Sequence, residues 1–409
     1  MEEFDVIVVG AGPAGLIAAG SAAESGGHVL VLEKMKQEGR KLLITGKGRC
    51  NITNDAEVGE FIQHVHPNGR FLRTAFGHFF SRDILSLLHN YGVETTCERG
   101  GRYFPSSNKS ADVLSALLNW VKERKVEIRC GQRVEKLLIE GQILKGVQAF
   151  GQEYRAPKVI LATGGKSYPA TGSNGEGYEL ARSAGHSIVN VRPSLVPLET
   201  GGGVAQKLQG LTLKNVRATV WVNDKKSGED FGEMLFTHFG LSGPIILTLS
   251  RKVVDALHQK NKVEIAIDLK PALDEQKLDA RLLRDLDEFG KKRISNLFRS
   301  WLPTSMIPVF TDLLGIDPEK EGHQLSSKER KRIRNLMKDF RFTITGHRSF
   351  KEAIITAGGI PTTEISSKTM ESKLISGLYF AGEMIDVDAE TGGYNLQIAY
   401  STGWLAGIS

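Results

Sequence analysis

The chain has 409 residues, of which 40% are hydrophobic and 45 are glycine. This length and composition favour an α/β protein of two or three domains with many tight turns. No apolar run is long enough to span a bilayer, and three acids among the first five residues argue against a signal peptide. Cys50, Cys97 and Cys130 are too widely spaced for a disulfide framework or a metal site, so we expect a cytoplasmic protein without a bound metal.

The net charge is +6, and much of the excess lies between Asp274 and Arg348. That stretch holds sixteen Lys or Arg and twelve Asp or Glu, which gives it a net charge of +4. A basic surface of this kind can bind nucleic acid. The acids are interspersed with the cations, however, which is more typical of solvated helix faces, so a nucleic-acid partner is not expected.

A glycine-rich turn near the N-terminus joins an apolar strand over residues 4–9 to a helix of small residues. The turn consists of Gly10, Ala11, Gly12, Pro13, Ala14 and Gly15. In a dinucleotide-binding unit, Gly10 would make the turn, Gly12 would admit a pyrophosphate and Gly15 would let the helix approach the strand. Glu33 ends a second strand, where its carboxylate can accept hydrogen bonds from a ribose. The pattern predicts a bound dinucleotide; the alternative is a buried unit whose glycines serve packing only.

A basic, glycine-rich segment follows the second strand, from Gly39 to Asn54, where the chain would cross the cofactor crevice. Small residues alternate in it with the cations Arg40, Lys41, Lys47 and Arg49. Glycines allow a close approach of the backbone, and the cations can neutralise phosphates. We interpret the segment as part of the cofactor site rather than as an ordinary basic loop.

Hydrophobic periodicity predicts an α/β domain that is interrupted by a β-rich insertion. Before the insertion we expect two helices in residues 61–91, further helices at 110–122 and 179–184, and strands at 126–130, 134–138, 146–150, 153–155 and 158–165. From about residue 191 we expect short strands at 218–222 and 263–268, an apolar helix at 245–257, and amphipathic helices at 279–301 and 328–339. A strand at 377–383 and a terminal helix from about residue 391 complete the chain, so that both chain ends would hold one nucleotide.

Several motifs together resemble those of the YhiN-like (BaiN-like) bacterial flavoproteins, which are NAD(P)/FAD-dependent oxidoreductases. The resemblance rests on the glycine-rich turn and on residues 39–54, 162–177, 235–244, 356–360 and 377–397, so it extends over almost the whole chain. It implies a discontinuous, Rossmann-like FAD-binding domain of the glutathione-reductase type, with an inserted β-rich domain that carries a small helical bundle. The implied bounds are 1–190 and 356–409 for the FAD-binding domain, 191–355 for the insertion and about 274–341 for the helices. The chain ends inside the predicted terminal helix, so a C-terminal tail is expected to be short or missing.

The resemblance also implies how FAD would be held. Glu33 would bind the adenosine ribose, and Thr163 and Gly164 would lie near the adenine-side phosphates. Glu383 would hold a ribityl hydroxyl, and Gly392–Leu396 would cover the pyrimidine edge of the flavin. The predicted cofactor-binding residues are Gly10, Ala11, Gly12, Pro13, Ala14, Gly15, Glu33, Lys34, Arg40, Lys41, Thr45, Gly46, Gly48, Arg49, Cys50, Asn51, Val134, Ala162, Thr163, Gly164, Gly382, Glu383, Gly392, Gly393, Tyr394, Asn395 and Leu396.

Flavin chemistry also needs a proton donor beside the substrate. His238 is the first candidate, because it lies in a glycine-rich turn at a helix start and a histidine titrates near neutrality; it could instead cap the turn. Arg102 and Tyr103 are further candidates, for binding a carboxylate or a carbonyl group. Cys50 has no partner at C-x-x-C spacing, which argues against a redox cysteine.

The leading hypothesis is a cytoplasmic FAD-dependent oxidoreductase that reduces an activated C=C bond of a small organic substrate with electrons from NAD(P)H. No second dinucleotide fingerprint is found in the sequence, so NAD(P)H would bind transiently, or another protein would deliver the electrons. Two alternatives stay open. One is an RNA-modifying flavoprotein, which the basic helices support, and the other is a non-catalytic FAD-binding sensor module.

Overall fold

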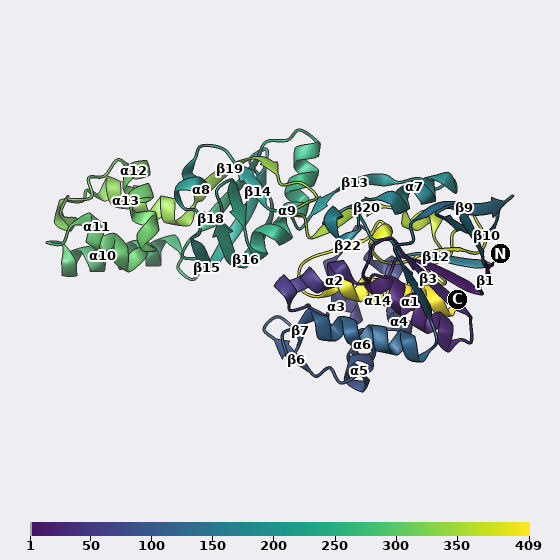
Figure 1. Ribbon diagram of the computed structural model, residues 1–409. Coiled ribbons are helices and arrows are strands. Elements are labelled where there is room, and N and C mark those ends of the chain that lie inside the picture. The colour runs from purple at the N-terminus through teal and green to yellow at the C-terminus, as the bar shows by residue number, and fades with distance from the viewer. Residues whose placement is uncertain (1) are drawn as a thin grey trace. The chain divides into compact units, whose positions relative to one another are not determined.

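The computed structural model describes residues 2–409 and divides into two compact units, which are described separately (Figure 1). Unit 1 combines the chain up to Pro193 with Phe350–Ser409, and unit 2 is Ser194–Ser349. The fold class predicted from the sequence is confirmed, since a Rossmann-like domain formed by both chain ends is interrupted by a β-rich insertion with helices. No helix within residues 2–409 is both long and apolar enough to cross a membrane.

A five-stranded parallel sheet forms the centre of unit 1. Its strand order is β21-β12-β2-β3-β8, with β21 at Leu378–Phe380, β12 at Lys158–Leu161, β2 at Val6–Val9, β3 at Val29–Glu33 and β8 at Glu127–Cys130. All four residues of β2 are buried. Parallel strands are covered on both faces, which explains why the central strands are continuous apolar runs rather than alternating ones.

Helices α1 (Pro13–Glu24) and α14 (Tyr394–Ile408) lie side by side against this sheet, although they come from opposite ends of the chain (Figure 1). Small residues make the contact possible. A Cβ on Gly403 would lie 2.3 Å from the Ala14 carbonyl oxygen, and one on Gly407 would lie 1.8 Å from Ser21 Oγ. The small-residue composition of α1 is therefore a packing requirement.

Four smaller sheets and further helices complete the described part of unit 1. The predicted β-meander is confirmed as the sheet β1-β11-β10-β9, in which β1 (Glu2–Glu3) joins the other three strands. The two helices predicted for residues 61–91 are present as α4 (Arg73–His78) and α5 (Ser81–Asn90). Helix α3 ends at Phe61, and Pro67, which lacks an N–H, lies between α3 and α4. The remaining bounds are β9 Val134–Glu140, β10 Ile143–Ala149, β11 Gln152–Arg155, β4 Thr53–Asn54, β5 Val65–His66, β6 Thr95–Glu98, β7 Arg102–Pro105, β13 Val189–Ser194, β20 Ile355–Gly359, β22 Asp388–Ala389, α2 Arg40–Ile44, α3 Val58–Phe61, α4 Arg73–His78, α5 Ser81–Asn90, α6 Ser110–Glu123 and α7 Glu176–Ser183.

Unit 2 contains a closed six-stranded barrel. The strand order is β14-β17-β16-β15-β18-β19, and β19 pairs back with β14 to close it. Helix α9 (Pro244–His258) packs on the barrel, and it begins with the predicted first-turn proline, although Gly243 rather than Ser242 is its N-cap. The remaining bounds are β14 Leu198–Thr200, α8 Val204–Lys207, β15 Thr212–Val222, β16 Lys225–Phe236, β17 Gly240–Ser242, β18 Val263–Asp268 and β19 Phe340–His347.

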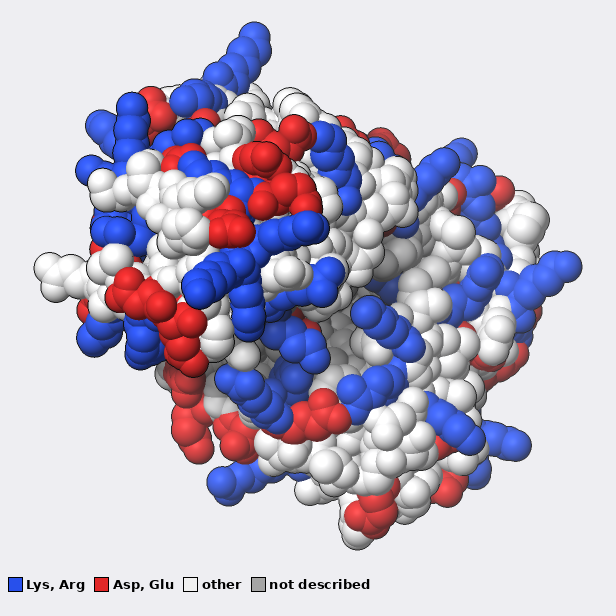
Figure 2. All heavy atoms as spheres, turned by 90° about the vertical axis from the view of Figure 1, so that its left-hand side faces the viewer, with Lys and Arg blue, Asp and Glu red and all other residues white. Residues whose placement is uncertain are grey.

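Four helices follow β18 in unit 2: α10 (Glu275–Phe289), α11 (Ile294–Trp301), α12 (Ile307–Leu314) and α13 (Ser327–Lys338). The single helix predicted for residues 279–301 was wrong, because the chain breaks at Gly290, whose Cβ would lie 2.6 Å from a carbonyl oxygen of α10. Three of the six basic side chains of α13 pair with acids of unit 2: Arg330 with Asp279 at 3.2 Å, Arg334 with Glu275 at 3.4 Å and Lys338 with Asp268 at 2.6 Å. Figure 2, in which the end of unit 2 that carries these helices faces the viewer, shows basic (blue) and acidic (red) side chains intermixed.

His186 ties the end of α7 to the loop before β21 in unit 1. The residue is 3% exposed, its Nδ1 lies 2.8 Å from Glu364 Oε2 and its Nε2 lies 2.8 Å from Ser372 Oγ. Ser372 Oγ accepts hydrogen bonds from two backbone N–H groups, so its own hydroxyl donates to Nε2 and the neutral ring donates to Glu364. The pKa of His186 is lowered by burial, and the hydrogen bond to Glu364, which acts in the opposite direction, does not reverse this.

We predict that the contribution of His186 to the stability of unit 1 is lost as the pH falls from 7 to 5. A histidine whose pKa is lowered on folding contributes stability above its ordinary value of 6.5, and this contribution is lost as the pH falls toward the lowered pKa. His186→Gln should reduce the fall in melting temperature between pH 7 and pH 5. Each kcal/mol of unfolding free energy corresponds to about 2–4 °C of melting temperature. Thermal melts of wild type, His186→Gln and the exposed-site control His89→Gln would test this; equal pH dependence in all three would contradict it.

Candidate functional site

Close contacts build the glycine-rich turn between β2 and α1. Gly10 has a φ of 103°, and a Cβ there would lie 2.7 Å from the Ala162 carbonyl oxygen. A Cβ on Gly15 would lie 1.9 Å from the Gly10 carbonyl oxygen, so both positions require glycine. At Gly12, no atom of the described residues beyond its chain neighbours lies within 4 Å of the Cβ position. The first turn of α1, from Pro13, therefore presents its N–H groups to open space that a phosphate can occupy.

Glu33, at the end of β3, lies beside this turn. Its Oε2 accepts a hydrogen bond of 2.8 Å from the Ala11 N–H, and its Oε1 accepts one of 2.8 Å from the Met35 N–H. These bonds fix the carboxylate at the carboxyl edge of the sheet, where a ribose hydroxyl can reach it. Lys34, the next residue, forms an ion pair of 3.1 Å with Glu176, so its charge is already compensated within the protein.

The turn after β12 packs against the glycine-rich turn through Ala162, as described above. Gly164 has a φ of 74°, and a Cβ there would lie 2.8 Å from Ser173 Oγ. Thr163 Oγ1 lies 3.1 Å from Met384 Sδ. The structure thus brings the predicted residues 162–164 to the same edge of the sheet as the first turn of α1.

Glu383, in the turn after β21, is the centre of a hydrogen-bonded network. Its Oε1 accepts hydrogen bonds of 2.8 Å from the Thr356 N–H and from Ser167 Oγ, and its Oε2 accepts one of 2.7 Å from Lys41 Nζ. Lys41 Nζ also lies 2.6 Å from Ser167 Oγ, and the Lys41 and Glu383 side chains are each 20% exposed. A carboxylate offers about four acceptor positions, so Glu383 can still accept a ligand hydroxyl.

The segment from Gly39 to Asn54 folds as α2 and a tight turn. Cys50 is fully buried in this turn, and burial raises the pKa of its thiol to about 12, which makes it unreactive. Arg49 forms an ion pair with Glu98, and its guanidinium lies 4.1 Å from the Phe104 ring centroid. These contacts account for Arg49 without a ligand. The turn also contains Thr45, Gly46 and Gly48.

Asn51 has a buried polar atom without a protein partner. Within residues 2–409, Asn51 Oδ1 is buried and accepts no hydrogen bond. An unpaired buried oxygen of this kind costs about 1–3 kcal/mol. The observation is the one expected of a site in which a bound ligand supplies the missing donor.

Gly392 and Gly393 form the turn that precedes α14, with φ of 140° and 99°. Asn54 Nδ2 donates a hydrogen bond of 2.9 Å to the Gly392 carbonyl oxygen. Asn395 fastens the other side of the turn, because its Nδ2 donates to the Ala389 carbonyl oxygen at 2.8 Å and its Oδ1 accepts from the Ala389 N–H at 2.9 Å. The remaining predicted positions are the buried Val134 at the start of β9, Gly382 in the turn after β21, and Tyr394 and Leu396 in the first turn of α14.

The register between α1 and α14 separates two helix N-termini by a defined distance. Gly403 contacts Ala14, one residue after the start of α1 at Pro13 and nine residues after the start of α14 at Tyr394. The contacts of Gly403 and Gly407 run in the same direction along α1, so the helices are parallel. At a rise of 1.5 Å per residue, α14 begins about 12 Å beyond α1. Two positive helix ends therefore lie about 12 Å apart along the helix direction.

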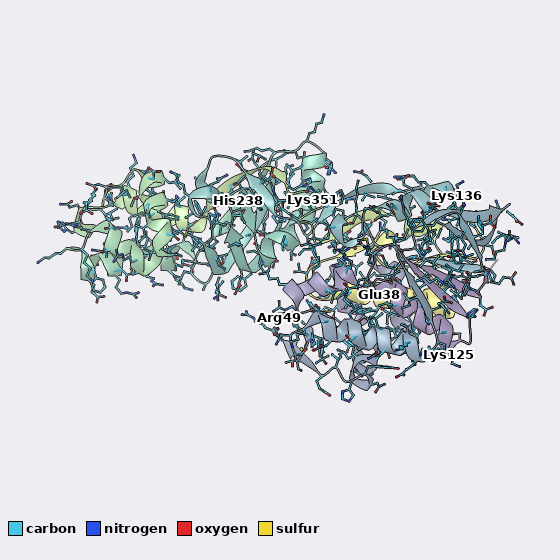
Figure 3. The ribbon with its side chains drawn as sticks, viewed as in Figure 1. Glu38, Arg49, Lys125, Lys136, His238 and Lys351 are labelled. Carbon is cyan, nitrogen blue, oxygen red and sulfur yellow. The ribbon has the colours of Figure 1, made fainter. Side chains whose placement is uncertain are left out.

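The three predicted catalytic residues lie in different units. Arg102 and Tyr103 lie on β7 in unit 1, where the Tyr103 hydroxyl donates to Asp55 Oδ1 at 3.3 Å. His238 is exposed in the turn between β16 and β17 of unit 2, where its ring packs edge-on against Phe239 with centroids 4.9 Å apart (Figure 3). The expectation that His238 stands at a helix start was wrong, since β17 lies between this turn and α9.

Ser167 and Thr356 complete the Glu383 network, and the sequence prediction missed both. Each lies within a stretch that supported the family resemblance, next to glycine-rich turns. Polar residues beside such turns were the available signal, but nothing in their spacing connects them to a carboxylate elsewhere in the chain. Only the fold brings Ser167 and Thr356 together with Glu383.

Comparison with known proteins gives full-length matches. The family described as HI0933-like protein Rossmann domain matches residues 4–409. A 3-dehydro-bile acid delta(4,6)-reductase of Clostridium scindens is 33% identical over 404 residues, which cover 98% of this chain and 97% of that protein. A ribosomal RNA dihydrouridine synthase of Escherichia coli is 30% identical over 406 residues, which cover 99% of this chain and 97% of that protein.

Among solved structures, a 3-ketosteroid delta1-dehydrogenase from Sterolibacterium denitrificans matches with a TM-score of 0.50 and 14% identity, covering 100% of this chain and 99% of that one. At this level of identity the likeness concerns the fold alone. The family model and the two full-length relatives carry the assignment, and they confirm the family that the motifs predicted. The chain therefore belongs to the HI0933-like family of flavoprotein oxidoreductases with a Rossmann-type FAD domain.

Proposed function

We propose that this protein is an FAD-dependent reductase of carbon–carbon double bonds conjugated to a carbonyl group in a small organic substrate, with NAD(P)H as the reductant. The observation that supports this most is the full-length, 33% identity with a 3-dehydro-bile acid delta(4,6)-reductase. The name of that relative describes reduction of double bonds at positions 4 and 6 of a bile acid that is oxidised at position 3. A conjugated ketone is therefore the substrate class proposed here.

The described site fits FAD on three observations. Open space lies in front of the α1 N-terminus at Gly12, which suits a pyrophosphate. The α14 N-terminus begins about 12 Å further out, which suits the flavin end of an extended FAD. The buried Asn51 Oδ1, which has no hydrogen-bond partner in the described residues, could accept a hydrogen bond from the cofactor. In this arrangement Glu33 would bind the ribose and Glu383 a ribityl hydroxyl.

FAD, when bound, supplies the two-electron chemistry, and the chain supplies binding, charge stabilisation and a proton. The first-turn N–H groups of α14 would stabilise negative charge at the pyrimidine edge of the flavin. Arg102 and Tyr103 would bind the substrate carbonyl, which gains negative charge as the double bond is reduced. His238, in unit 2, stays the proton donor predicted from the sequence. Cys50 takes no part, because its thiol is buried and protonated.

We predict that the purified protein binds FAD and that NADH or NADPH bleaches the flavin absorbance under anaerobic conditions. A 3-oxo-Δ4 steroid or another enone, added next, should restore the absorbance because it accepts the electrons. The measurement is an absorbance titration with each nicotinamide followed by the enone. FAD that resists both nicotinamides, or reduced FAD that no enone reoxidises, would contradict the proposal.

Gly12→Val is the matched control for this titration. Its φ of −79° and the absence of described atoms within 4 Å of the Cβ position allow the variant to fold. The valine side chain would occupy the space proposed for the pyrophosphate, so the variant should keep its thermal melt and lose FAD. An FAD affinity equal to that of wild type would place the cofactor elsewhere.

We predict that Lys41 and Glu383 act together in FAD binding. Lys41→Met or Glu383→Gln should each weaken FAD about tenfold, because each leaves the other partner's charge and hydrogen bonds unsatisfied in a mostly buried site. The double variant should lose less than the two single losses combined, since the pair is broken by either one. Calorimetric titration with FAD measures this. The control Lys207→Met removes an ion pair with Asp312 in which the two side chains are 60% and 69% exposed, and it should leave the FAD affinity unchanged. Unchanged FAD affinity in both Lys41→Met and Glu383→Gln would refute the prediction.

RNA modification is the second candidate function, and the 30% identity with a ribosomal RNA dihydrouridine synthase favours it. Dihydrouridine formation also reduces a double bond conjugated to a carbonyl group, so both relatives fit one type of chemistry. The ion pairs of α13 with acids of its own unit argue for the small-molecule substrate, because those cations are already compensated.

We predict weak RNA binding with a shallow salt dependence. The cations of α13 that are paired with acids would release few counterions, so the affinity should fall less than tenfold between low and moderate salt. Filter binding with a ribosomal RNA fragment over a salt series measures the slope. A steep slope, together with uridine-dependent reoxidation of the reduced flavin, would move the assignment to the RNA-modifying candidate.

A further inference from the structure

A cluster of titratable side chains lies immediately before the Gly392–Gly393 turn and outside the predicted site. His64 Nδ1 lies 2.7 Å from Glu390 Oε2, and His66 Nε2 lies 3.8 Å from Glu390 Oε1. The side chains of all three residues are 32% exposed. One carboxylate is thus held between two imidazole rings at the start of the chain's last helix.

The backbone fixes this cluster to the first turn of α14. Strands β5 and β22 pair antiparallel, and the Glu390 N–H donates to the His64 carbonyl oxygen at 3.1 Å. The His64 ring also stacks on the ring of Tyr394, the first residue of α14, with centroids 4.5 Å apart and an interplanar angle of 21°. Asn395 donates to the Glu390 carbonyl oxygen at 3.2 Å. His64 therefore contacts both the residue before the glycine turn and the residue after it.

The charges in the cluster depend on pH mainly through His64. The hydrogen bond to Glu390 raises the pKa of His64 above the ordinary 6.5, although burial opposes it, and Glu60 on α3 raises it further. Burial alone would raise the pKa of Glu390, but the hydrogen bonds from His64 and His66 lower it to about 2. Burial raises the pKa of Tyr394 to about 12, so the tyrosine stays neutral. Glu390 is therefore ionised at all physiological pH values, and its compensation is lost when His64 releases its proton.

We propose that His64 is a positioning residue that sets the charge beside the N-terminus of α14 and thereby couples proton uptake to flavin reduction. The inference rests on the FAD site proposed above. Reduced flavin carries one more negative charge than oxidised flavin near neutral pH, so it is favoured when a protonated His64 offsets Glu390. In balance, reduction delivers two electrons and one proton to the flavin, and His64 takes up as much as one further proton from solvent wherever the pH lies between the pKa of His64 in the oxidised protein and its pKa in the reduced protein.

The test is a spectroelectrochemical titration of the FAD-loaded protein over pH 5.5–9, in which an electrode supplies the electrons. For wild type, we expect the midpoint potential to fall more steeply with pH in an interval above pH 6.5 than in His64→Gln. The preference for reduced over oxidised FAD should change about tenfold more across this range in wild type, the size expected for coupling between partly buried charges. His89→Gln, which removes an exposed histidine that pairs with Glu94 at 3.0 Å, should keep the wild-type profile.

Glu390→Gln provides a second variant should His64→Gln fold poorly. Loss of the carboxylate removes the main cause of the raised pKa of His64, so the steep interval should move to lower pH. Identical profiles for wild type, His64→Gln and Glu390→Gln would overturn the role of His64 while leaving FAD binding intact. A wild-type protein that binds no FAD would instead refute the proposed function, so the two failures are distinguishable.

Discussion

The close packing of α1 against α14 is the constraint on which unit 1 depends. Gly403 and Gly407 allow α14 to approach the backbone of α1, and any side chain at these positions would meet atoms at 2.3 Å or less. The contact joins the first and last helices of the chain, and it sets the offset between their N-termini. Because a dinucleotide lies across the carboxyl edge of a parallel sheet, this offset determines where each end of the cofactor finds a positive helix end.

Local sequence patterns predicted the parts of the fold that depend on local structure. The turn from Gly10 to Gly15, the β-meander and the first-turn proline of α9 follow from backbone conformation and periodicity within a few residues. The closure of the barrel could not be read in this way, because β14 and β19 are paired across more than a hundred residues. The break at Gly290 was missed because the apolar spacing continues through it, whereas the glycine packs too closely for any other residue.

The candidate site shows the same division. Glu33 was predictable because its place at the end of β3 follows from the length of one βαβ unit. The partners of Glu383 were not, since Ser167 lies 216 residues away in the chain and no periodicity relates the two. Arg49 was predicted to neutralise phosphates or a reduced flavin because cations and small residues alternate in its segment. In the structure Arg49 contacts Glu98 and Phe104. The sequence pattern could not predict these contacts, because both partners lie about fifty residues further along the chain on other strands.

Two carboxylates of the C-terminal segment, Glu383 and Glu390, differ in how their charge is compensated. Glu383 pairs with Lys41, whose charge is permanent near neutral pH, whereas Glu390 pairs with His64, whose charge is not. In both pairs the acid comes from the C-terminal segment and the cation from the first 70 residues, so the ion pairs join the same two chain ends as α1 and α14. A permanent pair suits the region proposed for the ribityl chain, where the charge of the cofactor does not change. A titratable pair lies beside the helix end proposed for the flavin ring, where the charge changes with each reduction.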